Sequence, residues 1–314
     1  MKIIFLGSSN FAVPSLEALL KSPQKVCCVV TQPDKKKGRH LRLAATDVKS
    51  VAQKAGLHIF QPIDVNSPES ARYIAKFDPD LLVVVAYGQI LSQRILALPK
   101  IFALNIHASI LPKYRGAAPI SWAIIRGEKT TGITVIQLTE KMDAGPMLLQ
   151  KEIAISEDDD SLTLENKLRY LGANLLLEAL HKIKEKTCKL TAQDERKATL
   201  APKLKKNDGY IDWNKTAFEI LNLIRGSLPW PGAFTYYKDR LLKISKAGIG
   251  PFVPRKTGAQ GGGLVLNADK DLEIMADGSS LLIKELQPES KKKMSAAEFI
   301  SGYKVKAGEI FGKK

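Results

Sequence analysis

Short apolar runs alternate along the first half of the chain with longer segments whose apolar residues recur every three or four positions. The apolar runs predict strands at residues 2–6, 25–31, 57–60, 81–86 and around Asn105 and His107. The helical spacing predicts helices at residues 11–21, 46–55, 68–76 and 91–98. Because continuous runs such as LLVVVA are typical of strands buried on both faces, this alternation predicts an α/β fold with a doubly wound, mostly parallel, Rossmann-like sheet.

The pattern changes in the second half of the chain. A helix at 117–126, a strand at 132–138 and a long helix at 160–185 are followed by a polar segment without periodicity. After a further helix at 216–225 come short strands bounded by glycine or Asp-Gly turns, which suggest a small β-barrel. We therefore predict a first domain over residues 1–190, a linker over 191–207 and a second domain over 208–314.

Composition is that of a soluble globular protein, with 45% hydrophobic and 25% charged residues among 314. No apolar run reaches the roughly 20 residues that span a bilayer, and the first segment lacks the features of a signal peptide, so a cytoplasmic protein without membrane contact is expected. Cys27 and Cys28 are adjacent and Cys188 stands alone, so no cysteine has the spacing of a zinc or redox motif.

The net charge of +16 is shared by both halves of the chain and favours a polyanionic partner. A long connection after the second strand concentrates basic residues around a glycine, namely Lys35, Lys36, Lys37, Arg39 and Arg42. Such a segment suits phosphate or a nucleic-acid groove. The alternative is a solvated surface loop, but the overall charge favours nucleic-acid contact.

Candidate chemistry lies at the end of one apolar strand. Asn105 and His107 alternate on it, so both side chains leave the same face, where open α/β sheets hold ligands. Asp143, in the turn-rich loop 139–146, is placed to return over this strand end. A histidine beside a strand end is often structural and a loop aspartate is often a turn residue, so from these residues alone catalysis and structure are about equally supported.

The turn after the first predicted strand is the position at which a dinucleotide-binding fingerprint would occur. Its sequence is GSSNFA, so Ser9 and Ala12 stand where the G-x-G-x-x-G fingerprint has its second and third glycines. A nicotinamide dinucleotide is therefore disfavoured, although the following helix N-terminus suits a small anion.

Two segments carry a family resemblance, ALNIHASILPKYRGAAPI and GITVIQLTEKMDAGPML. They resemble the core of the folate-dependent formyltransferases, whose signature is an Asn-x-His pair with an aspartate on a following loop. TQPDKKKGR, VVAYGQIL, IDWNKTAFEILNLIRGSLPWPGAFT and LQPESKKKMSAAEFI extend the likeness nearly end to end, toward the members that act on methionyl-tRNA. Ser92, where the family often has proline, is a small departure.

The resemblance implies transfer of the formyl group of 10-formyltetrahydrofolate to the amino group of methionine on initiator tRNA. The chemistry of the three residues suits this reaction. Asn105 can donate to the oxyanion, and His107 can donate to it or help to move the proton of the amine. Asp143, if hydrogen-bonded to His107, would fix its tautomer and favour its protonated form. Folate is expected near the loop 87–91 and along four successive residues, Ser109, Ile110, Leu111 and Pro112.

The resemblance further implies an OB-like second domain, and barrels of that kind commonly bind nucleic acids, here tRNA. No metal is called for, and a monomer is expected. Two relatives with the same core compete with this interpretation. Sugar-nucleotide formyltransferases have no need of the basic segment, and glycinamide ribonucleotide transformylase is too short to account for the C-terminal half. A third alternative is a tRNA-binding module with an idle core, which intact Asn105, His107 and Asp143 disfavour.

Overall fold

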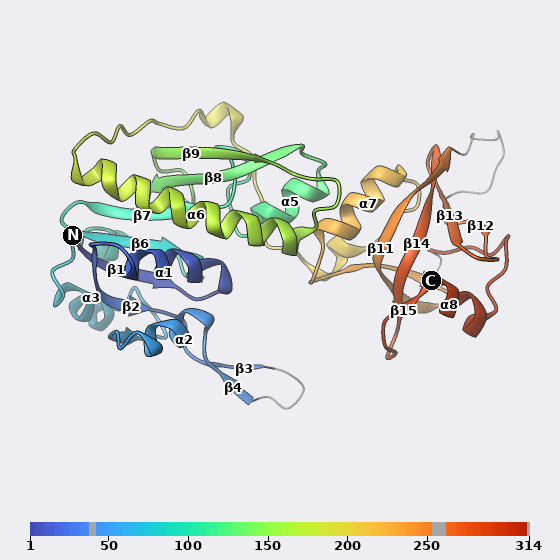
Figure 1. Ribbon diagram of the computed structural model, residues 1–314, viewed down its shortest axis with the longest axis horizontal. Coiled ribbons are helices and arrows are strands. Elements are labelled where there is room, and N and C mark those ends of the chain that lie inside the picture. The colour runs from blue at the N-terminus through green and yellow to red at the C-terminus, as the bar shows by residue number, and fades with distance from the viewer. Residues whose placement is uncertain (38–41, 253–261, 313–314) are drawn as a thin grey trace. The chain divides into compact units, whose positions relative to one another are not determined.

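The protein was analysed as a computed structural model that describes residues 1–37, 42–252 and 262–312 (Figure 1). The chain forms two compact units. The first comprises Met1–Pro119, Thr130–Ala154 and Glu165–Ala201, and the second comprises Ile120–Lys129, Ile155–Leu164 and Pro202–Lys314. Neither unit is one continuous stretch, whereas the sequence suggests domains over 1–190 and 208–314.

A seven-stranded sheet forms the centre of the first unit. Its strands are β1 (Lys2–Gly7), β2 (Lys25–Val30), β5 (Ile59–Phe60), β6 (Leu81–Val85), β7 (Phe102–His107), β8 (Thr130–Gln137) and β9 (Met147–Ala154). They lie in the order β5-β2-β1-β6-β7-β8-β9. The first five are parallel, β8 is antiparallel to β7, and β9 is antiparallel to β8. The predicted mostly parallel sheet is confirmed.

Helices cover both faces of this sheet, which confirms the doubly wound prediction (Figure 1). They are α1 (Val13–Leu20), which follows the 3-10 turn η1 (Asn10–Ala12), then α2 (Asp47–Lys54), α3 (Pro68–Ala75), α4 (Gln93–Leu96) and α6 (Ser161–Lys184). Ile74 of α3 and Ile95 of α4 share one apolar cluster with Ile4. On the opposite face α6 approaches β7 so closely that a Cβ at Gly172 would lie 3.0 Å from Ile106 Cγ2.

Three strands of the first unit were not predicted. β9 is an edge strand whose residues are mostly half-buried or exposed, so it lacks the apolar run that marks the inner strands. The basic segment folds as a hairpin of β3 (Lys35–Lys37) and β4 (Arg42–Ala44), although a row of basic residues carries no strand pattern.

The second unit is an antiparallel sheet with helices around it. It contains α7 (Ala217–Gly226), β10 (Ala233–Tyr237), β11 (Arg240–Phe252), β12 (Val265–Asn267), β13 (Leu272–Ala276), β14 (Ser279–Pro288), β15 (Met294–Ser295), α8 (Ala296–Tyr303) and most of α5 (Pro119–Ile125). The strand order is β10-β11-β14-β13-β12, and β15 pairs with β14. The short 3-10 turns η2 (Glu195–Lys197) and η3 (Lys206–Gly209) precede this sheet in the chain.

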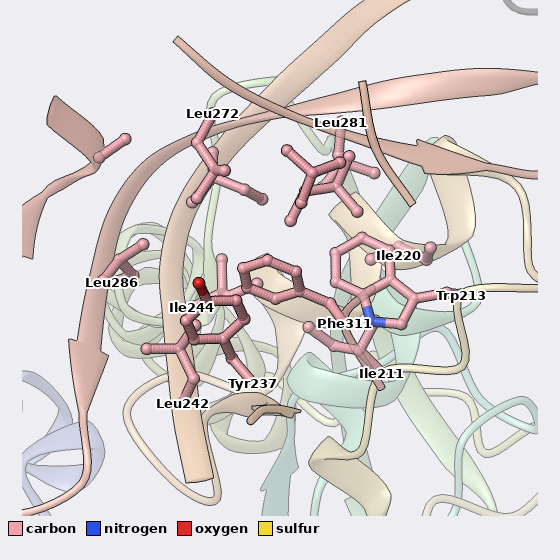
Figure 2. Close-up of a cluster of buried hydrophobic side chains, with 14 of the residues drawn as sticks. Ile211, Trp213, Ile220, Tyr237, Leu242, Ile244, Leu272, Leu281, Leu286 and Phe311 are labelled. Atoms are coloured by element: carbon pink, nitrogen blue, oxygen red, sulfur yellow. The ribbon is translucent and has the colours of Figure 1, made fainter. Parts of the chain in front are cut away.

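Residues 308–312 join the two edges of this second sheet. Val265, on β12, donates its N–H to Glu309 O at 2.8 Å, and the Gly312 N–H reaches Tyr236 O on β10 at 2.9 Å. The edge strands are thereby bridged through backbone hydrogen bonds, as in a closed barrel. Aromatic and aliphatic side chains including Trp213, Tyr237 and Phe311 fill the interior (Figure 2).

Candidate active site

Strand β7 presents the first two candidate residues at its carboxyl end. The register pairs Val84 with Asn105, so Asn105 and His107 project from the same face of the sheet as the cluster that contains Ile4. His107 is only 5% exposed, and Asn105 is half-buried. Within the described part of the chain the Asn105 side-chain amide makes no hydrogen bond, so its N–H groups are available to a ligand.

His107 is held by a backbone carbonyl on one side and faces a carboxylate on the other. Its Nε2 lies 2.9 Å from Tyr114 O. Because a carbonyl only accepts, Nε2 carries a hydrogen, and in the neutral ring Nδ1 carries none. Asp143 Oδ2 lies 3.6 Å from this Nδ1 and accepts a hydrogen bond from Gly116 N at 2.8 Å. The backbone carbonyl of Tyr114 therefore sets the tautomer, a role expected of Asp143 from the sequence.

The structure thus brings the three expected groups to one strand end. Asp143 adopts a left-handed backbone conformation with φ of 51°, which is uncommon for a residue with a side chain and marks constrained sites. Its carboxylate is buried to a similar degree as the imidazole, at 12% and 6% side-chain exposure. An amide donor, an imidazole and a carboxylate in this arrangement suit addition of an amine to a carbonyl carbon.

The segment expected to meet folate is fixed by its own protein contacts. Thr134 Oγ1 donates to Ser109 O at 2.6 Å and accepts from Leu111 N at 3.1 Å, while Gln150 Nε2 donates to Leu111 O at 2.9 Å. Ser109 and Leu111 are buried, and Ile110 and Pro112 are partly exposed. Since these backbone groups are already paired, Ile110 and Pro112 are the members of this segment that a ligand can reach.

The second expected folate segment, residues 87–91, follows strand β6. Gln89 secures it, because its Oε1 accepts from Val65 N and its Nε2 donates to Ile63 O, each at 3.0 Å. Ile90 is 64% exposed, whereas Tyr87 is buried and its hydroxyl has no partner within the described part of the chain. Burial, and secondarily the Asp64 carboxylate, raises the pKa of Tyr87, so this phenol stays neutral.

The structure describes the positions of some, but not all, of the basic residues expected to bind tRNA. Lys37 pairs with Arg42 and Lys36 with Leu43 across β3 and β4, and Lys35 is exposed. Arg39 lies outside the described residues. Within the described ranges, no three His, Cys, Asp or Glu side chains gather as a metal site would require, and no helix there is both long and apolar enough to traverse a bilayer.

Comparisons with known proteins give the relationship. The model of the formyl transferase family matches residues 1–180, and that of the formyl transferase C-terminal domain matches residues 203–304. A methionyl-tRNA formyltransferase of Desulfotalea psychrophila is 46% identical over 315 residues, covering 99% of this chain and 95% of the relative. Another, of Caldanaerobacter subterraneus, is 44% identical over 311 residues and covers 99% of each.

The chain belongs to the methionyl-tRNA formyltransferase family. Solved structures outside this family share its fold. An N-formyltransferase of Helicobacter canadensis, solved with folinic acid and dTDP-3-aminofucose, superposes with a TM-score of 0.68 at 20% identity, over 92% of this chain and 99% of that one. Glycinamide ribonucleotide transformylase 1 of Symbiobacterium toebii superposes with a TM-score of 0.51 at 22% identity, over 62% of this chain and 94% of that one. Neither rival resemblance approaches the full-length identity of the methionyl-tRNA formyltransferases.

The sequence of this methionyl-tRNA formyltransferase family member does not directly reveal the residues that hold the candidate site in place by hydrogen bonds. Thr134 and Gln150 hold the segment 109–112, yet both lie on strands where a polar residue is unremarkable. Arg115 and Gly116 lie between His107 and Asp143 in the chain, and their place in ALNIHASILPKYRGAAPI, a stretch that carries the family resemblance, is the signal that could have found them. Gln193 lies in the segment expected as a linker, and nothing in its surroundings marks it.

Proposed function

We propose that this protein transfers the formyl group of 10-formyltetrahydrofolate to the amino group of the methionyl residue on initiator tRNA. The main observation behind this proposal is that Asn105, His107 and Asp143 lie together at one strand end. The chain that carries them is 41–46% identical, over nearly its full length, to methionyl-tRNA formyltransferases. Residues 109–112 and 87–91 supply the folate contacts, and the hairpin with the second unit supplies the tRNA contacts. A cytoplasmic location and a monomeric state stay predictions.

The reaction joins the amine nitrogen to the formyl carbon and then breaks the bond from that carbon to N10 of the folate. Negative charge develops on the formyl oxygen in the tetrahedral intermediate, and the unpartnered amide of Asn105 donates a hydrogen bond to it. The attacking amine loses one proton, and N10 gains one as it leaves. Nδ1 of His107, beside the Asp143 carboxylate, is where that proton is held between the two steps.

Formyl transfer with purified protein tests this proposal. Labelled 10-formyltetrahydrofolate is supplied with initiator methionyl-tRNA, elongator methionyl-tRNA or a dTDP-amino sugar, and product is expected with the initiator tRNA. Asn105→Ala is expected to lower kcat about 100- to 1,000-fold, the usual loss of one oxyanion donor, with tRNA binding retained. Asn174→Ala, at an exposed asparagine on α6 in the first unit, is the control. Near-normal turnover by N105A removes Asn105 from the site, and tRNA binding without formylation by the wild type identifies an idle module.

The tRNA contact is tested separately through the hairpin. Binding of tRNA is expected to weaken steeply with salt, since basic groups release counterions when they neutralise phosphates. Arg39→Ala is expected to raise the KM for tRNA more than the KM for folate. Lys54→Ala removes an exposed charge from the end of α2 and serves as the control. Equal changes in both KM values count against the hairpin as a tRNA contact.

A further inference from the structure

The loop that carries Asp143 is tied down by one buried side chain, that of Gln193. Gln193 Nε2 donates to Asp143 O at 2.8 Å and to Gly145 O at 2.7 Å. Gly145 is itself pressed against β8, because a Cβ there would lie 1.7 Å from Gln137 O. These carbonyls belong to the left-handed residue Asp143 and to the residue two positions after it, so one side-chain amide holds the backbone of this turn at two points.

The orientation of the Gln193 amide is dictated by Arg115. The Nε and Nη2 atoms of Arg115 donate to Gln193 Oε1 at 3.1 and 2.8 Å. Because a guanidinium only donates and a carbonyl only accepts, the amide has just one orientation in which all four contacts are hydrogen bonds. Arg115 is 8% exposed and is anchored by Glu195, whose carboxylate accepts from Nη1 at 2.9 Å and from Nη2 at 2.7 Å. Such a bidentate pair fixes the guanidinium plane.

The side chain of Asp143 is fixed from the same segment of chain. Its Oδ2 accepts from Gly116 N, and the backbone before Gly116 pairs with residues that follow Gln193. Arg115 N donates to Thr199 O at 2.8 Å, and Ala201 N donates to Arg115 O at 2.7 Å. Gly116 has φ of +125°, and a Cβ on it would lie 2.6 Å from Ala201 O, so only glycine permits this approach.

We propose that Gln193, oriented by Arg115, is a positioning residue that holds Asp143 against His107 Nδ1. This inference rests on the proposed function, in which that pair handles the transferred proton. The distance from Asp143 Oδ2 to Nδ1 is 3.6 Å, so a small loop movement decides whether the two groups interact. Gln193 touches neither His107 nor the expected position of the substrates and acts through the Asp143 loop.

The isosteric change Gln193→Glu tests this role. One carboxylate oxygen keeps the contact with Arg115, while the other faces the carbonyls of Asp143 and Gly145 and repels both. We expect kcat to fall about 10- to 100-fold, as for reacting groups displaced by around 1 Å, and the KM values for folate and tRNA to stay within about twofold. Gln24→Glu is the control, because it adds the same charge in the first unit at the amino end of β2, where Gln24 Oε1 accepts from the N-terminal amine of Met1 at 3.0 Å.

A double-mutant cycle separates positioning from general loss of structure. If Gln193 acts through Asp143, the variant Q193E/D143N has the same kcat as D143N, since effects within one unit do not add. Multiplied effects, or a Q193E kcat within threefold of wild type, overturn the inference. A wild-type kcat for D143N instead defeats the catalytic assignment of Asp143.

A second variant keeps the test open if Q193E does not fold. Arg115→Lys retains the cation beside Glu195 but cannot hold Gln193 Oε1 with two donors. It is expected to lower kcat in the same direction by a smaller factor and, again, to have no effect in the D143N background. An unchanged kcat for R115K in folded protein overturns the inference.

Discussion

Replacing Thr134 with valine is expected to destabilise the first unit far more than its small change in shape suggests. The Thr134 hydroxyl, on a fully buried side chain, donates to Ser109 O and accepts from Leu111 N and Gln150 Nε2, at 2.6, 3.1 and 2.8 Å. Gln150 keeps its second acceptor, Leu111 O, but Ser109 O and Leu111 N lose their partner. Each buried backbone group left unpaired costs about 1–3 kcal/mol, so the free energy of unfolding should fall by about 2–6 kcal/mol, a large part of the ~5–15 kcal/mol of a typical protein.

Urea unfolding measures this loss, and the same strand provides its control. Thr131 of β8 is 3% exposed and bonds none of these groups, so Thr131→Val removes a buried hydroxyl without releasing the segment 109–112. The KM for folate should rise in T134V alone, because Ile110 and Pro112 are no longer held in place. If T134V and T131V agree within about 0.5 kcal/mol and their folate KM values are equal, the hydrogen bonds of Thr134 do not organise this segment.

Two further predictions concern ionisable groups. Burial raises the pKa of Cys28 to about 12, so in the folded protein this thiol should resist Ellman's reagent at pH 8, while the partly exposed Cys27 and Cys188 react. Above about pH 9 the Cys28 thiol ionises only in the unfolded chain. The free energy of unfolding that buried Cys28 contributes should therefore decline above that pH. Thr216 caps α7 and donates hydrogen bonds to the Glu219 carboxylate. Thr216→Ala should therefore lower the free energy of unfolding, measured by thermal unfolding, by about 1 kcal/mol. Because backbone and hydroxyl donors of Thr216 lower the pKa of Glu219 from 4.5, this difference should be present above pH 4.5 and shrink as pH falls below it; an equal difference at pH 3 and pH 7 contradicts the capping box.

The sequence predicts most of the first sheet because its inner strands are buried on both faces. The continuous apolar run at residues 81–86, for example, predicts a fully buried strand, and β6 spans Leu81–Val85. The alternation of Asn105 and His107 in an apolar run likewise identifies two polar side chains on one face. β9 carries no such signal because it buries no continuous apolar face, and the hairpin carries none because its sequence is a row of basic residues.

The supporting contacts of the site cannot be predicted in this way, and Gln193 shows why. Its amide meets the backbone of residues 143 and 145, about fifty positions earlier in the chain, and hydrogen bonds to carbonyls place no demand on the sequence at those positions. A polar, aperiodic segment indicates a linker whether it is solvated or folded back onto a domain. Residues 191–201 are folded back, since Thr191 exchanges two backbone hydrogen bonds with Met147 at 2.8 and 2.9 Å. The candidate catalytic groups are thus found from their side-chain types, while the groups that place them are found only from coordinates, and in our proposal the Asp143–His107 distance depends on both.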